Sequence, residues 1–217
     1  MRILRPPITN VTALNYASDE QIADFFHMRL VQALKKTTGQ IAMALPRATT
    51  SDPILALLVG RSLEWERVTL FPTDDCDVAE RHEASAVGAL RALMEPNGAR
   101  VTRLVEGMDT PRFALAWLAM GGDGSVASLF PDTLSDGPDL ERVRAVTPDP
   151  LPSDAPFARL TLTIPALLDC EDMVFVIRGQ SKREVFEGAL KGQHDLPVRA
   201  LLEAREDGIA MPVTCFY

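Results

Sequence analysis

The sequence has little cysteine and no long apolar run, and each absence excludes a class of protein. The three cysteines, Cys76, Cys170 and Cys215, are odd in number and widely separated, which argues against a disulfide framework and a CxxC metal site. No run of about 18 apolar residues occurs, and the first residues lack an apolar segment of signal-peptide length. We therefore expect a cytoplasmic protein that binds neither a membrane nor a metal.

Basic charge is also scarce. The chain carries 22 lysine and arginine residues against 30 aspartate and glutamate residues, a formal net charge of −8. This balance gives no broad basic face, so nucleic acid is not an expected partner and any anionic ligand must be bound by a few local cations. With 217 residues, 47% of them hydrophobic, the chain can build one large core. We expect a single domain over residues 1–217.

Apolar patterning predicts the fold class. Residues 18–36 carry apolar side chains at helical spacing after Ser18, a candidate N-cap. Strands are predicted at 40–45, 67–72, 100–105, 113–120, 158–164, 173–179 and 211–217, and helices at 52–63, 83–94, 181–190 and 197–206. This alternation is typical of an α/β fold, a mostly parallel open sheet with helices on both faces. Residues 131–157, rich in proline and acidic residues, are interpreted as a loop.

The segment 118–131, LAMGGDGSVASLFP, is interpreted as a strand ending in a glycine-rich turn that opens a helix. In parallel sheets, ligands bind beyond the carboxyl ends of the strands, where glycines allow close backbone approach. The turn contains the candidate binding residues Gly121, Gly122, Asp123, Gly124 and Ser125. On pattern alone, a tight connecting turn without a ligand fits equally well.

The longer string GGDGSVASLFP resembles the GxDGHxASLFP signature of the 6-phosphogluconolactonases, which are relatives of the glucosamine-6-phosphate deaminases. TDDCDVAERHEAS, residues 73–85, resembles the family's DERxVPxxHxDSN segment. Residues 159–190 resemble its RITLT and GxxK region and keep Arg159 and Lys182. Because the order and spacing agree over nearly the whole chain, the sequence is identified as a member of this family.

The resemblance implies a three-layer fold like that of the glucosamine-6-phosphate deaminases. It also implies hydrolysis of 6-phosphoglucono-1,5-lactone to 6-phosphogluconate in carbohydrate metabolism, by a monomer that needs no metal or organic cofactor. The partner is then a small sugar phosphate. In the family a lysine at the position of Lys182 faces the phosphate, and the histidine of the signature is the favoured general base. That histidine is Ser125 here, and a serine hydroxyl without an adjacent base is a poor proton acceptor.

Two further departures alter the expected site. The family's SGGSTP loop is replaced by LPRATTSDP, in which Pro46 lacks a backbone donor, and the arginine of the DER motif is Cys76. Arg47 with Thr49 or Thr50 is a candidate replacement for binding the phosphate, although a solvated loop charge explains Arg47 as well. For Arg159, a structural salt bridge is as plausible as substrate binding.

The catalytic candidates are Asp74, His82 and Ser125. His82 follows the acidic loop and is a candidate replacement base, although an exposed loop histidine is the simpler interpretation. Asp74 and Asp75 end a predicted strand, where a role as base, as hydroxyl ligand or as helix cap is possible. Cys76 is interpreted as a small, half-buried residue rather than a reactive thiol.

Three functions remain open from the sequence. The first is an active 6-phosphogluconolactonase with an unusual base or a mechanism that relies on positioning and electrostatics. The second is a relative that has lost catalysis and binds a sugar phosphate or a protein partner. The third, an amino-sugar phosphate isomerase or deaminase, ranks last because the ASLFP continuation resembles the lactonases.

Overall fold

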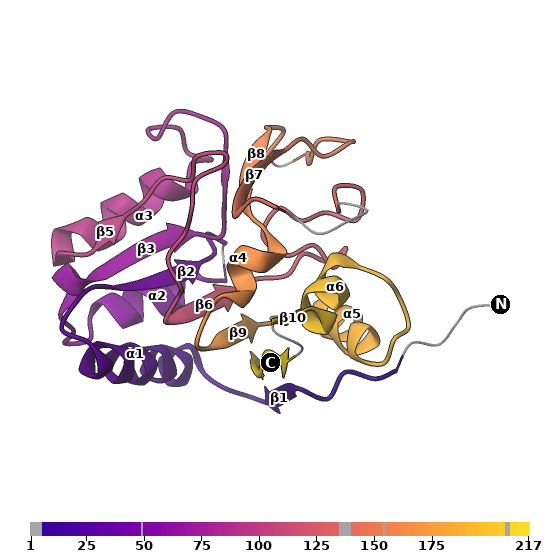
Figure 1. Cartoon of the computed structure of the whole chain (residues 1–217), viewed down its shortest axis with the longest axis horizontal. Helices are drawn as coiled ribbons and strands as arrows, with labels where there is room; N and C mark the ends of the chain where they lie inside the picture. Colours follow the sequence, from indigo (N-terminus) through magenta and orange to yellow (C-terminus); the bar gives the residue numbers. More distant parts are fainter. Residues whose placement is uncertain (1–5, 49, 135–139, 154, 207–208) are drawn as a thin grey trace.

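A parallel seven-stranded sheet is the frame of the molecule (Figure 1). The structure is a computed structural model that describes residues 6–48, 50–134, 140–153, 155–206 and 209–217. The strand order is β1 (Val11–Leu14), β12 (Val213–Phe216), β9 (Met173–Val176), β6 (Leu115–Leu118), β2 (Ile41–Leu45), β3 (Val68–Pro72) and β5 (Arg100–Val101). The predicted parallel sheet is therefore confirmed, and β1 is an edge strand that the apolar pattern did not reveal.

Helices cover both faces of this sheet, and the sheet divides the hydrophobic core into two clusters. One face carries α1 (Asp19–Lys36), α2 (Asp52–Val59) and α3 (Ala86–Met94), and the other carries α4 (Ile164–Leu168), α5 (Gln180–Leu190) and α6 (Pro197–Glu203). Short 3-10 turns, η1 (Trp65–Arg67) and η2 (Glu95–Asn97), precede β3 and β5. The three-layer α/β expectation is confirmed. Within the described part of the chain, no helix combines the length and the apolar character needed to cross a membrane.

The central strand β6 shows why the parallel sheet could be predicted from the sequence. Its four residues are all buried, with Leu115 and Trp117 in one core cluster and Ala116 and Leu118 in the other. On the first face, the Trp117 ring lies 4.7 Å from the ring of Phe26 in α1. A strand buried on both faces is a continuous apolar run in the sequence, which is the pattern of a parallel sheet.

A second, antiparallel sheet corrects two sequence expectations. It joins β4 (Asp74–Cys76), β8 (Arg159–Leu162) and β7 (Val143–Val146), and a further small hairpin joins β10 (Arg205–Glu206) to β11 (Ile209–Ala210). The predicted strand at 158–164 therefore does not join the parallel sheet, and the predicted loop 131–157 contains β7. The physical reason is burial, because β7 and β8 are partly exposed and lack the continuous apolar run of the main strands.

The predicted helix after the glycine turn is absent from the described residues 119–134. Two isolated antiparallel bridges, Met120 to Val126 and Val126 to Leu129, use backbone groups that a helix would need. Ala127 has a positive φ of 52°, which also interrupts a right-handed helix. The segment is thus a compact turn, and its N–H groups are not aligned as a helix start.

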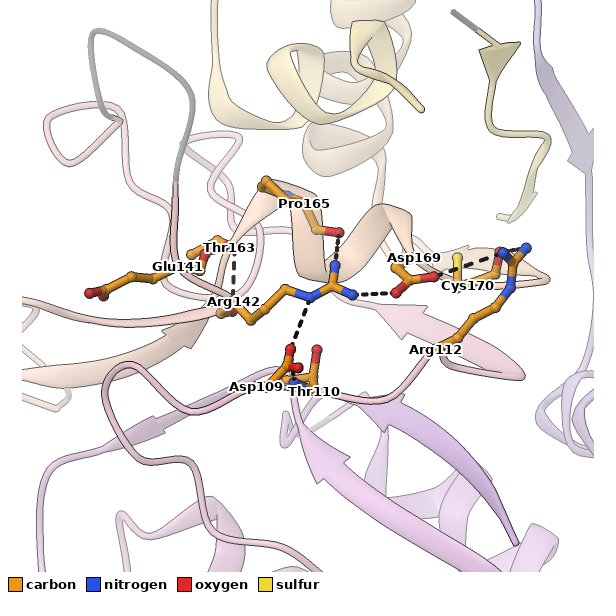
Figure 2. A network of polar contacts seen from close by, with 9 residues as sticks. All are labelled: Asp109, Thr110, Arg112, Glu141, Arg142, Thr163, Pro165, Asp169 and Cys170. Carbon is orange, nitrogen blue, oxygen red and sulfur yellow. Dashed lines mark hydrogen bonds and ion pairs between the residues drawn. The ribbon is translucent and has the colours of Figure 1, made fainter. Parts of the chain in front are cut away.

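Arg142 fastens the small sheet to α4 (Figure 2). Its Nη1 donates to the carbonyl of Pro165 at 2.9 Å, and its Nη2 donates to the carboxylate of Asp169. Thr163 Oγ1 donates to the carbonyl of Glu141 at 2.7 Å beside it. Asp109 lies 3.6 Å from Arg142 Nε, but its side chain is 92% exposed. These contacts fix the end of β7 against a helix that packs on the parallel sheet.

We expect Arg142→Gln to lower the free energy of unfolding by about 1–3 kcal/mol, because it leaves the 17% exposed Asp169 carboxylate without its main partner. The matched variant Asp109→Asn removes an exposed partner and is expected to change it by less than about 0.5 kcal/mol. Urea unfolding measures both. Equal effects of the two variants would show that the partly buried ion pair of Arg142 with Asp169 does not hold the sheet in place.

Candidate active site

Two adjoining cavities open at the carboxyl edge of the parallel sheet. The glycine-turn cavity, about 490 Å³, is lined by residues 46–48, 73–74 and 119–123, by Ser125 and by Lys182, among others. The His82 cavity, about 860 Å³, is lined by residues 74–76, 82–84 and 155–157, among others. Both are lined by Arg47, Ala48, Asp74 and Arg159. These four residues form the boundary between the two cavities.

Close side-chain packing shapes the glycine turn. A Cβ on Gly121 would lie 2.4 Å from both Asp123 Oδ1 and Ser125 Oγ, so a larger residue there would have to displace these two hydrogen-bonded side chains. Gly124 has a φ of +79° and packs behind the cavity, where a Cβ would meet Leu196 at 2.7 Å. Gly122 has open space around it and lines the cavity. The two packed glycines hold the turn so that Gly122 and Asp123 face the cavity.

Ser125 is bound to Asp123. Its Oγ donates to Asp123 Oδ1 at 2.6 Å, and its N–H donates to the same oxygen at 3.0 Å. The other carboxylate oxygen, Oδ2, has no hydrogen-bond partner among the described residues. The Ser125 hydroxyl thus donates its proton to the Asp123 carboxylate and holds that side chain in place.

Asp74 is held at the boundary of the two cavities by three side chains. Ser128 Oγ donates to Asp74 Oδ2 at 2.5 Å, Thr73 Oγ1 donates to Oδ1 at 3.2 Å, and Arg159 Nη1 lies 3.5 Å from Oδ2. Ser128 is fully buried, and its N–H donates to Thr161 Oγ1 at 3.1 Å. Ser128 was missed as a site residue in the sequence, although it is the serine of the ASLFP part of the signature.

Asp75 lines the His82 cavity, and its carboxylate caps α3. It accepts from the N–H groups of Ala86 at 2.6 Å and Val87 at 3.3 Å, and from Ser85 Oγ at 3.4 Å. Burial raises the pKa of the Asp75 carboxyl above its usual value, and the backbone donors of α3 oppose that rise. Of the roles left open by the sequence, the helix cap is the one that these contacts support.

His82 lies in the His82 cavity and is exposed. Its Nδ1 accepts from the N–H of Ala84 at 3.1 Å, and its ring meets the ring of Phe157 edge-on, with 5.2 Å between the centroids. It does not line the glycine-turn cavity. The structure therefore separates His82 from Ser125 and Asp123.

The cations at the site differ in how they are paired. Lys182, the third residue of α5, lines the glycine-turn cavity, and no ion pair joins it to any other residue that the structure describes. The N–H groups of the first turn of α5 lie beside it. Arg47 lines both cavities and is exposed, with its Nε 3.4 Å from Asp52 Oδ1. Lys182 is thus available to bind an anion.

The altered loop before α2 contributes less than expected. Thr50 lines neither cavity, and Thr49 lies outside the described residues. The loop is closed by Ser51, whose Oγ accepts from the N–H of Ala48 at 2.8 Å and donates to its carbonyl at 2.7 Å. Among the described residues, no three His, Cys, Asp or Glu side chains gather closely enough to hold a metal ion.

Comparison with known proteins gives consistent matches. A family model described as glucosamine-6-phosphate isomerases/6-phosphogluconolactonase matches residues 94–210. A 6-phosphogluconolactonase of Pseudomonas aeruginosa is 30% identical, covering 81% of this chain and 83% of that protein. One of Helicobacter pylori is 29% identical, covering 91% and 92%.

Solved structures match over nearly the full length. The crystal structure of a 6-phosphogluconolactonase from Shewanella baltica superimposes with a TM-score of 0.81 at 20% identity and covers 97% of this chain and 98% of that one. The 6-phosphogluconolactonase of Thermotoga maritima gives a TM-score of 0.76 at 22% identity, with 95% and 97% covered. At such identities the structural matches establish the fold, and the fold that the sequence resemblance implied is confirmed.

We expect Gly121→Ala to destabilise the glycine turn, because its Cβ would overlap Asp123 Oδ1 and Ser125 Oγ. The expected loss in the free energy of unfolding is about 1–3 kcal/mol. Gly122→Ala, where the added Cβ meets open space, is the matched control and is expected to stay within about 0.5 kcal/mol. Urea unfolding compares them, and an unaffected Gly121→Ala protein would contradict the close approach.

The raised pKa of Asp75 predicts a pH effect on stability. Because the folded pKa lies above the unfolded value of about 3.9, the folded state binds the proton more tightly, and stability rises as the pH falls through this window. Relative to Asp75→Asn, which cannot titrate, the wild-type protein should therefore gain unfolding free energy between pH 6 and pH 4. Urea unfolding at both pH values measures this difference. A relative loss for the wild-type protein would be the contrary result.

Proposed function

The chain belongs to the family of glucosamine-6-phosphate isomerases and 6-phosphogluconolactonases, and we propose on that premise that it hydrolyses 6-phosphoglucono-1,5-lactone to 6-phosphogluconate. One observation carries the proposal: Lys182, without an ion pair among the described residues, and the Asp123–Ser125 pair line the same cavity of about 490 Å³. A cation for a phosphate and a carboxylate for a water molecule are the parts that such a hydrolysis needs.

In this proposal the phosphate binds to Lys182, to the first-turn N–H groups of α5 and to Arg47. The lactone ring lies against the glycine turn, where Gly121 and Gly122 leave room for close approach. The N–H of Gly122 has no partner among the described residues and is available to the substrate. Asp74, whose carboxylate Ser128 holds in place, accepts hydrogen bonds from the ring hydroxyls.

Asp123 takes the role of the base. Its Oδ1 is held by Ser125, so its Oδ2 is free to accept a proton from a water molecule. The water oxygen then bonds to the C1 carbonyl carbon, the bond between C1 and the ring oxygen breaks, and the proton passes to the ring oxygen. His82 has no part in this mechanism because its ring packs on Phe157 in the His82 cavity.

We propose further that residues 1–217 act as one domain and as a cytoplasmic monomer that binds neither nucleic acid nor a membrane. The three cysteines are buried and form no disulfide, which fits a reducing compartment. The two core clusters share one parallel sheet, which supports a single domain. The net charge of −8 disfavours nucleic acid.

A second candidate function is binding of a sugar phosphate without hydrolysis. The observation that favours it is the contact of Ser125, because a hydroxyl that donates to Asp123 at 2.6 Å stands where the family signature has a histidine. Binding of 6-phosphogluconate and turnover of the lactone must therefore be measured on the same protein.

We expect the purified protein to accelerate lactone opening above the buffer rate. Asp123→Asn keeps an acceptor for Ser125 but loses the base, so the catalysed rate should fall by about 100-fold or more. His82→Gln tests the rival base and is expected to retain most of the rate. A larger loss for His82→Gln than for Asp123→Asn would overturn the assignment of the base. Calorimetric binding of 6-phosphogluconate without any acceleration would instead favour the second candidate function.

A further inference from the structure

Arg159 is a largely buried cation with weak partners. Its side chain is 16% exposed, and its two contacts with hydrogen-bond acceptors among the described residues, Nη1 to Asp74 Oδ2 and Nη2 to the carbonyl of Ala155, are both 3.5 Å long. Its Nε is buried and has no partner among the described residues. Burying a charge is unfavourable unless it is well paired. The guanidinium therefore has unused capacity for an anion.

Asp74, the carboxylate that Arg159 contacts in the described part of the chain, does not fill that capacity. Asp74 Oδ2 already accepts a 2.5 Å hydrogen bond from Ser128, and its 3.5 Å distance to Arg159 is at the limit of a hydrogen bond. The Phe130 ring lies 5.9 Å from the guanidinium carbon and limits its movement on one side. The position of the cation is thus set by packing and by Asp74, with donors left over.

Arg159 also lies at a different place from Lys182. It lines both cavities, whereas Lys182 lines only the glycine-turn cavity. In the pairing of β4 with β8, Arg159 lies opposite Cys76, a small side chain that also lines the His82 cavity. Besides the exposed Arg47, the site therefore offers two separate positive charges, Lys182 at the start of α5 and Arg159 at the boundary of the cavities.

We propose that Arg159 binds the negative charge that forms at C1 of the substrate. This proposal rests on the proposed function, hydrolysis of the lactone. The lactone carries one anionic group, its phosphate. Hydrolysis adds water at C1, breaks the bond to the ring oxygen and releases a proton, so the product has a second anion, a carboxylate at C1. A fixed guanidinium with unused donors stabilises the oxyanion of the transition state and then this carboxylate.

The test compares two ligands that differ only at C1. 6-Phosphogluconate has a carboxylate there, and glucitol 6-phosphate has a hydroxymethyl group. We expect calorimetry to show that the wild-type protein binds 6-phosphogluconate about 10-fold more tightly or better. In Arg159→Met this preference should fall to near one, while the affinity for glucitol 6-phosphate stays nearly unchanged. Arg159→Lys keeps the charge and should keep part of the preference.

Lys182→Met is the matched control, because loss of a phosphate ligand should weaken both ligands by the same factor. If Arg159→Met weakens both ligands equally, Arg159 binds the phosphate and the proposal is overturned. A preserved preference in a folded Arg159→Met protein, judged by circular dichroism, would show that Arg159 is only structural. The binding ratio is independent of turnover, so a wild-type protein with the preference but without lactone hydrolysis would contradict the proposed function and leave the assignment of Arg159 to the C1 carboxylate supported.

Discussion

The path of the chain through residues 73–76 is the constraint on which the site depends. Thr73, between β3 and β4, links the two sheets, since its N–H donates to Leu45 at the end of β2 and its carbonyl accepts from Leu162 at the end of β8, each at 2.9 Å. Side chains alternate along an extended segment. Asp74 lines both cavities, while the carboxylate of Asp75, which lines only the His82 cavity, caps α3. The same crossing brings Arg159, on β8, to the carboxyl edge of the parallel sheet.

The charged side chains at the carboxyl edge of the parallel sheet come from several different elements. Lys182 is placed by the start of α5, and Arg159 by the small antiparallel sheet. Asp123 is placed by the glycine turn, through its contact with Ser125. Each charged group thus comes from a different element, and each element packs on the parallel sheet or on its neighbour. Such a site can bind a phosphate at one end and a reacting carbonyl at the other without the signature histidine.

Much of the fold could be predicted from the sequence, and the rest was hidden for physical reasons. Strands such as β6 are buried on both faces and read as apolar runs, and α1 begins at Ser18, whose side chain accepts from the N–H of Gln21 as predicted. The antiparallel sheet was missed because β4 and β7 are short and only partly buried. The prediction of a helix after the glycine turn was wrong because this segment forms isolated β-bridges and Ala127 has a positive φ. Lys182 could be located from a motif, but the contact of Ser128 with Asp74 joins residues 54 positions apart and could not.

We infer that one ligand spans two separate cations, with its phosphate at Lys182 and its C1 group at Arg159. A crystal structure of the protein with 6-phosphogluconate tests this most directly. The account predicts phosphate oxygens within hydrogen-bond distance of Lys182 and the first turn of α5, and the carboxylate on the Arg159 guanidinium beside Asp123. A phosphate bound to Arg159, or a ligand confined to the cavity around His82, would contradict it.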